Sequence, residues 1–289
     1  MKLIQASAMG VVLSKLGTAL GAAAEGIDLN RPLDGATADA LHRALLDNLV
    51  LCIRGQSLTP AAYLAAMRGF GKPLPQVRIA SRHAKIPEIM ILSSEDRDVA
   101  GDGKRLVVGA HWHSDDSYKA VPCSLTMLYG LEVPEIGGDT QFTNMYRAYD
   151  DLSPERQRRI VNLRVVHKYD SPRKGTAIAT LRSDEAAQLP DVIHPLVRRH
   201  PETHRQALYM NPNRMSHILG LERGESDRLL DELIRHAIEL RYQYRHQWRP
   251  GDIVIWDNRC TMHKANADYA PGAKRVMHRI IVEGTVPAA

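Results

Sequence analysis

Three ionisable side chains stand close together in the segment 110–116, which reads AHWHSDD. His111, His113 and Asp115 alternate along it, so an extended strand would place all three on one face. Imidazole nitrogens and carboxylate oxygens on a shared face are suitable ligands for a transition metal. The spacing therefore predicts a metal site, but it does not select two ligands from the three.

A further ligand has to come from another part of the chain, and His263 in WDNRCTMH (256–263) is the best candidate. We expect it in a turn after the apolar strand DIVIW (252–256), where a side chain can project into the mouth of a barrel. Two histidines and one carboxylate on one face of an octahedron leave three positions open, which suits Fe(II) oxygenases. A structural zinc site would instead be closed by four protein ligands. Because a His-x-Asp pair alone is often incidental in a chain with 13 histidines, the surrounding sequence has to decide.

Many short strands, punctuated by Gly and Pro, follow one another from residue 106 onward. Helices are expected near 36–48, 60–68, 154–161 and 224–240, and Thr59 followed by Pro60 is typical of a helix N-terminus. This pattern predicts a mainly β chain, a sandwich or jelly roll with flanking helices. The polar stretch near 168–190 predicts a loop or insertion that could act as a lid. The expected strands are 50–55, 87–94, 106–115, 123–133, 138–144, 163–170, 206–211, 242–248, 252–258 and 276–284.

The composition is that of an ordinary globular protein, with 289 residues that suffice for one large domain over 1–289. The formal charge of +5 is mild, and scattered basic residues without interleaved aromatics favour a solvated surface over a nucleic-acid partner. The three cysteines have no CxxC spacing and fit a reducing compartment. Lys15 interrupts the apolar start, and no segment approaches the roughly eighteen apolar residues of a membrane span. We expect a cytoplasmic protein without membrane or nucleic-acid partners.

Four motifs carry a resemblance to a known family: WHSDDSY (112–118), PEIGGDTQFTNMYRAYDDLS (134–153), RPGDIVIWDNRCTMHKANADY (249–269) and KRVMHR (274–279). Together they resemble the taurine and 2,4-dichlorophenoxyacetate dioxygenase family, and GIDLNRPL with VLCIRGQSLTP fits the opening of that family. The resemblance implies a double-stranded β-helix that uses Fe(II), 2-oxoglutarate and O₂. It implies that a small organic substrate is hydroxylated while 2-oxoglutarate becomes succinate and CO₂. It also implies a homo-oligomer, since oligomers are common in the family.

The resemblance assigns roles to individual residues. It makes His113, Asp115 and His263 the iron ligands, and it leaves His111 as a pocket residue or a neighbour of the ligands. Thr140 and Arg275 match the residues that hold the distal carboxylate of 2-oxoglutarate. The remaining matches concern the prime substrate: Arg279 for its anionic end, Tyr118 for an aromatic wall, and His83 for a substrate-binding histidine.

Departures from the taurine pattern bear on the substrate. The taurine pattern has Asn where this chain has Gly109, and an apolar residue where it has Asp116, which argues against taurine itself. Arg214, in YMNPNR (209–214), offers a second cationic anchor, although Asn and Pro there also fit a simple turn. An aryloxyalkanoate or similar carboxylate is favoured, with an alkylsulfonate or sulfate ester as the alternative.

Two non-catalytic interpretations stay open at this point. A cupin-like metal-binding protein could use His111 and His113 with His263, but it would leave Thr140 and Arg275 unexplained. A relative that keeps the fold only as an interaction scaffold would have no need of the three metal ligands.

Overall fold

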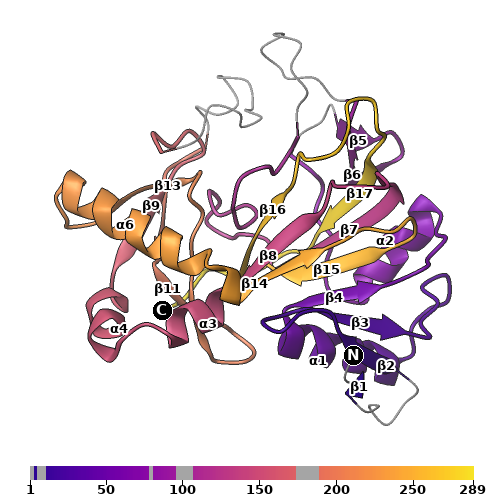
Figure 1. The fold of residues 1–289 in the computed structure, drawn as a ribbon, viewed down its shortest axis with the longest axis horizontal. Helices are drawn as coiled ribbons and strands as arrows, with labels where there is room; N and C mark the ends of the chain where they lie inside the picture. The colour runs from indigo at the N-terminus through magenta and orange to yellow at the C-terminus, as the bar shows by residue number, and fades with distance from the viewer. Residues whose placement is uncertain (1–2, 5–10, 78–80, 96–106, 174–188) are drawn as a thin grey trace.

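The computed structural model describes residues 3–4, 11–77, 81–95, 107–173 and 189–289, and it is built around two β-sheets (Figure 1). The larger sheet has nine strands in the order β1-β2-β3-β4-β15-β7-β17-β6-β5. Its strands are β1 (Leu3–Ile4), β2 (Val12–Lys15), β3 (Ala22–Glu25), β4 (Val50–Ile53), β15 (Ile253–Asp257), β7 (Leu125–Glu132), β17 (Val276–Ile281), β6 (Ile86–Ser93) and β5 (Arg82–His83). The smaller sheet is β14 (Gln243–His246), β8 (Thr140–Asn144) and β16 (Thr261–Ala265), in that order.

The central strand β15 shows how the layers are held together, because all five of its residues are buried. Val254 and Trp256 point into a core that includes Phe142 of the smaller sheet, whereas Ile253 and Ile255 point into a second core with the helices. A strand covered on both faces reads as a continuous apolar run, since alternate side chains enter opposite layers. The architecture is the predicted jelly roll: mainly β, with helices packed outside.

Helices α1 (Gly35–Asn48) and α2 (Pro60–Arg68) cover the outer face of the larger sheet (Figure 1). Asp34 and Thr59 cap their N-termini, accepting backbone hydrogen bonds from Thr37 and Ala62, as the Thr59-Pro60 signal predicts. The remaining elements lie on the side of the molecule away from α1 and α2, on the left in Figure 1. These are α3 (Met145–Asp150), α4 (Pro154–Ile160), α6 (Arg223–Ala237), η2 (Leu240–Tyr242), β9 (Arg164–His167), β10 (Val192–Pro195), β11 (Val197–Arg199), β12 (Gln206–Leu208) and β13 (Met215–Ile218).

Several expectations need correction. Within 106–115, the described residues 107–115 do not form a strand; the segment is irregular and makes a single β-bridge at His113. His263 lies in strand β16 and not in a turn, because the turn after β15 is complete by Cys260. The helix expected to reach residue 240 ends at Ala237. Most of the expected lid, 174–188, lies outside the described residues.

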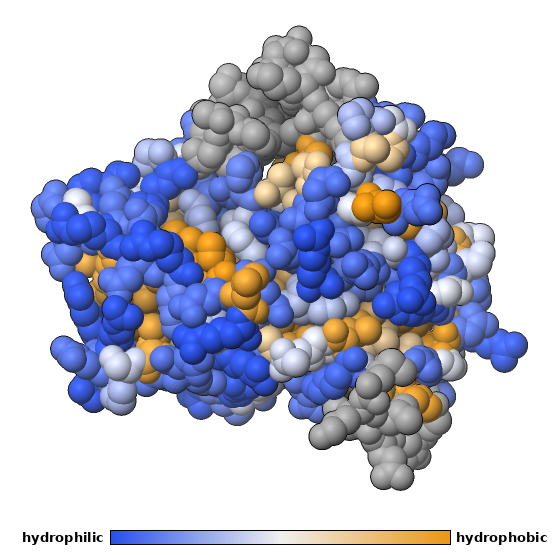
Figure 2. Space-filling model, viewed as in Figure 1, coloured by the Kyte–Doolittle hydropathy of each residue, from blue (hydrophilic) through white to orange (hydrophobic). Residues whose placement is uncertain are grey.

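The surface is consistent with a core that has taken up most of the apolar side chains. The face in Figure 2 is largely hydrophilic, with apolar residues in small separate groups. Across the described ranges, no helix combines the length and apolarity of a membrane span.

Candidate metal centre and substrate cavity

Backbone pairing brings the two candidate histidines together. His113 and His263 form an isolated antiparallel bridge, in which each backbone N–H donates to the other's carbonyl, at 3.0 and 2.8 Å. The two imidazole rings lie 4.2 Å apart between their centroids. Strand β16 is in turn paired with β8, so the position of His263 is fixed by the smaller sheet. An irregular segment is thus held against a regular strand at the residue where chemistry is expected.

Asp115 completes the group. Its two carboxylate oxygens lie 3.8 Å from His113 Nε2 and 3.8 Å from His263 Nε2. The Thr126 hydroxyl donates to the Asp115 carboxylate at 2.6 Å, and Arg279 Nη2 lies 2.8 Å from its other oxygen. The carboxylate is therefore held facing both imidazoles.

The protonation states suit metal binding. Burial alone would raise the pKa of Asp115, but the charge of Arg279, the two imidazoles and the Thr126 hydrogen bond together hold it well below its ordinary value. Burial lowers the pKa of His113 against the pull of Asp115, and burial lowers the pKa of His263 further still. A carboxylate that is ionised and imidazoles that are neutral at pH 7 are the forms that bind a metal.

The donor set fits a ferrous ion. His113 Nδ1 lies 2.7 Å from the His111 carbonyl, so Nδ1 carries the ring hydrogen. The Nε2 atom, on the side of Asp115, is then left with a lone pair for a metal ion. His263 Nδ1 is buried and finds no partner among the described residues. Two nitrogens and one carboxylate, open on one side, match the ligand preference of non-haem iron.

Two other groups of potential ligands exist in the described part of the chain. One is Cys52, His246 and Asp252; the other is His200, Asp257 and Cys260. In the second, Arg259 forms a two-pronged ion pair with Asp257, so the carboxylate is already neutralised. Only the group of His113, Asp115 and His263 has residues that line the two cavities described next.

Two cavities meet at the candidate ligands. The larger, of about 190 Å³, is lined by His111, Tyr118, Arg214 and Arg279 among others. The smaller, of about 70 Å³, is lined by Thr140 and Arg275 together with Leu92, Leu128 and Trp256. His113, Asp115 and Arg279 line both cavities. A metal bound by these residues would therefore lie beside both cavities.

The smaller cavity has polar groups fixed in its wall. Thr140 begins strand β8, and its hydroxyl accepts a hydrogen bond from the Trp248 indole at 3.0 Å. Arg275 Nε donates to the carbonyl of Gly138 at 3.0 Å. Gly138 has a φ of +71°, and a Cβ there would lie 3.1 Å from the Pro134 ring and 3.3 Å from the Arg275 side chain. Glycine suits this position because of the positive φ and the close packing of both neighbours.

The larger cavity has an aromatic and cationic wall. Tyr118 and Tyr169 meet edge to face at 4.9 Å, and Arg214 stacks over Tyr169 at 4.1 Å and over Tyr118 at 5.4 Å. His111 is exposed at the cavity and contributes its carbonyl to His113. His83 does not line either cavity; its ring packs edge-on against His278, 6.1 Å away.

The residues that support the ligands were not predicted from the sequence. Asn258 accepts a hydrogen bond from the backbone of Asp115 at 3.3 Å and donates to Thr126 at 2.9 Å. Trp256 donates to the same Asn258 at 3.0 Å. The signal for Asn258 was present in the WDN motif, whereas Thr126 becomes recognisable only when β7 is paired with β15.

A jelly roll that gathers two histidines and a carboxylate between two cavities is typical of a non-haem iron oxygenase. Residues 13–281 match the family model described as "Taurine catabolism dioxygenase TauD, TfdA family". The chain is 34% identical over 281 residues to the alpha-ketoglutarate-dependent 2,4-dichlorophenoxyacetate dioxygenase of Cupriavidus pinatubonensis (strain JMP 134 / LMG 1197), covering 94% of this chain and 97% of that protein. It is 33% identical over 283 residues to pentalenolactone F synthase of Streptomyces arenae, covering 92% of each.

A solved structure agrees with these relatives. The crystal structure of AAD-2 in complex with Mn(II) and N-oxalylglycine superposes with a TM-score of 0.82 at 28% identity, covering 97% of this chain and 100% of that one. The chain belongs to the TauD/TfdA family and is an Fe(II)- and 2-oxoglutarate-dependent dioxygenase that uses O₂. The resemblance stated from the motifs is confirmed, and the cupin-like and scaffold interpretations are set aside.

Proposed function

We propose that the dioxygenase hydroxylates a small anionic organic substrate, an aryloxyalkanoate or similar carboxylate being the favoured class. We further propose that His113, Asp115 and His263 hold the iron. The observation that carries both proposals is the meeting of two cavities at these three side chains. Arg279 lines both cavities, Arg275 lines only the smaller of the two and Arg214 only the larger.

The smaller cavity suits the cosubstrate. Thr140 supplies a hydroxyl and Arg275 a guanidinium, and a carboxylate accepts hydrogen bonds from both kinds of donor. Leu92 and Leu128 offer apolar contact for the carbon chain between two carboxylates. When bound, iron and 2-oxoglutarate would supply the oxidising chemistry, in which the prime substrate, O₂ and 2-oxoglutarate are converted to the hydroxylated substrate, succinate and CO₂.

The larger cavity suits the prime substrate. Arg279 lies beside Asp115, so a carboxylate gripped by its planar fork would be held next to the metal ligands. The protein then positions the adjacent carbon for reaction by fixing the charged end. Tyr118 and Tyr169 present ring edges and faces that suit an aryl group.

Arg214 adds a second positive charge to this wall. It donates to the carbonyl of Tyr169, and no acidic residue in the described ranges pairs with it. His111, exposed at the same cavity, is proposed as a pocket residue. Both features favour an electron-rich substrate with an anionic group.

An alkylsulfonate or sulfate ester is the alternative, since an arginine fork binds these groups as well. One observation weighs against a taurine-type pocket. Gly109 has a φ of +80°, and a Cβ at this position would lie 3.1 Å from the His113 ring. The asparagine of the taurine pattern would therefore press on a proposed iron ligand, so this chain needs a different arrangement on that side. Assembly as a homo-oligomer stays a prediction that sedimentation can test.

The test uses anaerobic protein loaded with Fe(II) and 2-oxoglutarate. We expect a weak visible charge-transfer band, followed by substrate-stimulated succinate formation when O₂ and a panel of aryloxyalkanoates, carboxylates and sulfonates are added. Arg279→Gln should keep the band but raise KM for a carboxylate substrate by about one to two orders of magnitude, because a charged hydrogen bond contributes about 1.5–3 kcal/mol.

The matched control is Arg275→Gln, which alters the same kind of side chain in the smaller cavity. It should weaken the affinity for 2-oxoglutarate and leave the KM for the prime substrate largely unchanged. If the two variants showed the opposite pattern, the assignment of the cavities would be wrong. Preference for sulfonates over all carboxylates would move the alternative substrate class ahead.

A further inference from the structure

Thr140 and Trp248 make a hydrogen bond whose direction has a consequence for ligand binding. The Trp248 indole can only donate, so at 3.0 Å the Thr140 hydroxyl must act as acceptor. A threonine hydroxyl has one hydrogen, and no acceptor among the described residues takes it. Thr140 is 3% exposed and lines the smaller cavity, so its hydrogen is left for a ligand there.

We propose that Trp248 is a positioning residue: its indole N–H orients the Thr140 hydroxyl so that this hydroxyl donates to a carboxylate oxygen of 2-oxoglutarate. The inference rests on the proposed function, in which Thr140 contacts the cosubstrate. Without the indole, the hydroxyl is free to rotate or to act as an acceptor, and a carboxylate gains nothing from an acceptor. Trp248 acts through Thr140 and does not itself line either cavity.

The indole is held firmly enough for this role. Its ring packs edge-on against His246 at 4.7 Å, and the side chain is 8% exposed. On β7, Gly130 leaves room for the ring, since a Cβ there would lie 3.2 Å from Trp248. His246 and Thr140 are also directly paired across β14 and β8, which sets the distance from Trp248 to the hydroxyl.

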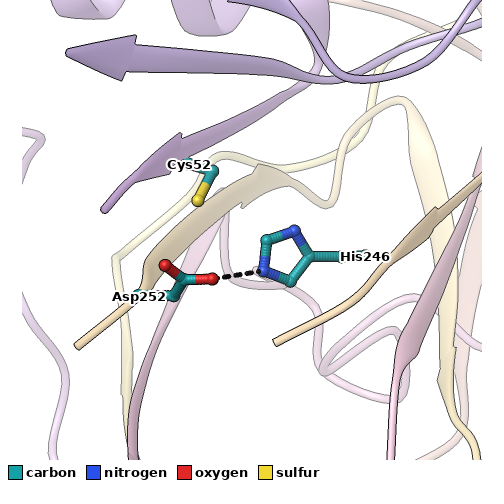
Figure 3. Close-up of side chains that lie close together, drawn as sticks. All are labelled: Cys52, His246 and Asp252. Atoms are coloured by element: carbon teal, nitrogen blue, oxygen red, sulfur yellow. Dashed lines mark hydrogen bonds and ion pairs between the residues drawn. The ribbon is translucent and has the colours of Figure 1, made fainter. Parts of the chain in front are cut away.

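A buried polar cluster stabilises the segment that carries Trp248. Figure 3 shows Cys52, His246 and Asp252 converging from three segments. One carboxylate oxygen of Asp252 lies 3.2 Å from His246 Nε2 and accepts from Arg54 Nη1 at 2.7 Å and from the backbone N–H of Arg249 at 3.0 Å. Asp252 thus ties the residues on either side of Trp248 to the end of β4.

Cysteine, histidine and aspartate side chains can also bind a metal, but the contacts of this cluster favour a structural role. The Tyr244 hydroxyl lies 2.8 Å from His246 Nδ1, so a neutral ring protonated at Nε2 satisfies both nitrogens. The guanidinium of Arg54 already neutralises Asp252, and a divalent cation would have to compete with it. We therefore assign this cluster to the support of Trp248.

A double-mutant cycle on 2-oxoglutarate affinity tests the proposal. The dissociation constant is measured from the visible band of the anaerobic Fe(II) protein in the wild type, Trp248→Phe, Thr140→Val and the double variant. Phenylalanine keeps an aromatic ring without the donor, and valine keeps the shape of threonine without the hydroxyl. We expect Thr140→Val to weaken binding about tenfold and Trp248→Phe about threefold to tenfold. The double variant should match Thr140→Val alone, because the tryptophan has nothing left to orient.

Tyr244→Phe is the matched control, since it removes another buried hydrogen bond beside the same histidine. It should leave the dissociation constant within about twofold of the wild type. Unchanged binding in Trp248→Phe, additive losses in the double variant, or an equal loss in Tyr244→Phe would each overturn the positioning role. Unchanged binding in Thr140→Val would overturn the proposal together with the assignment of Thr140 to the cosubstrate, so the two failures are distinguishable.

Discussion

Metal binding should stabilise this protein through His113, Asp115 and His263, and not through the two other groups of potential ligands in the described part of the chain. Mn(II) is a suitable probe, being a divalent ion that does not consume 2-oxoglutarate with O₂. At a free concentration 100 times the dissociation constant, it should stabilise the folded state by about 2.7 kcal/mol. Each kcal/mol shifts Tm by roughly 2–4 °C in domains somewhat smaller than this one, so we expect a rise of about 5–10 °C. Asp115→Asn should weaken binding about a hundredfold or more, leaving about 0.4 kcal/mol and a rise of about 1 °C at the same concentration.

The comparison has a close control, because Asp257 shares its burial and its kinds of charged neighbour with Asp115. Both are buried carboxylates paired with an arginine and lie near a histidine. Each substitution to Asn removes a buried charge, so each variant should be less stable without metal, and the Mn(II) shift is measured from that lower baseline. Asp257→Asn and Asp252→Asn should retain the full shift. Calorimetry that found the shift lost in either of them and kept in Asp115→Asn would refute the assignment of the metal centre.

Two further predictions concern stability away from the metal. Burial and the nearby charge of His83 lower the pKa of His278 to about 4, whereas the pKa of histidine in an unfolded chain is near 6.5. Between these two pH values the unfolded state binds more protons than the folded state. The free energy of unfolding therefore falls as the pH drops through this window. After allowance for solvent screening, His278→Gln should remove about 1 kcal/mol of the loss between pH 6.5 and 5, as measured by urea unfolding; an unchanged pH dependence would contradict this. Gly251 and Gly272 both have positive φ, but a Cβ on Gly251 would lie 2.7 Å from the Gln56 carbonyl, whereas Gly272 faces open space. Gly251→Ala should therefore cost about 2–4 kcal/mol and Gly272→Ala about 1 kcal/mol, and equal costs would show that the contact is not the cause.

The sequence was sufficient for the architecture where the apolar pattern is strong. The buried run of β15 and the capped helices α1 and α2 were predicted close to their observed bounds. The failure at 107–115 has a physical cause: Gly109 has a positive φ, which ends any regular strand there. Alternation therefore gave no valid reason to group His111 with His113, and the bridge to His263 is what separates them.

The candidate site was predictable to the extent that its residues lie in motifs. Thr140 and Arg275 were assigned by the resemblance, and the cavity they line is consistent with that assignment. Trp248 and Thr126 were not found, because each acts through a hydrogen bond to a residue distant in sequence. His83 lies outside both cavities and packs against His278, so no observation supports its predicted role in substrate binding.

The two sides of the candidate site are built differently, and this difference explains why the family motifs specify the reaction and not the prime substrate. The smaller cavity is formed largely by paired strands: β8 carries Thr140, β16 carries His263, and β17 begins directly after Arg275. Register fixes these positions, so a motif that matches in sequence also matches in space. The larger cavity is formed mainly by irregular residues in the ranges 107–118 and 211–214. Loops tolerate substitution and set specificity on a rigid scaffold, so the same family motifs permit different prime substrates, and the identity of this one depends on the residues that the motifs do not cover.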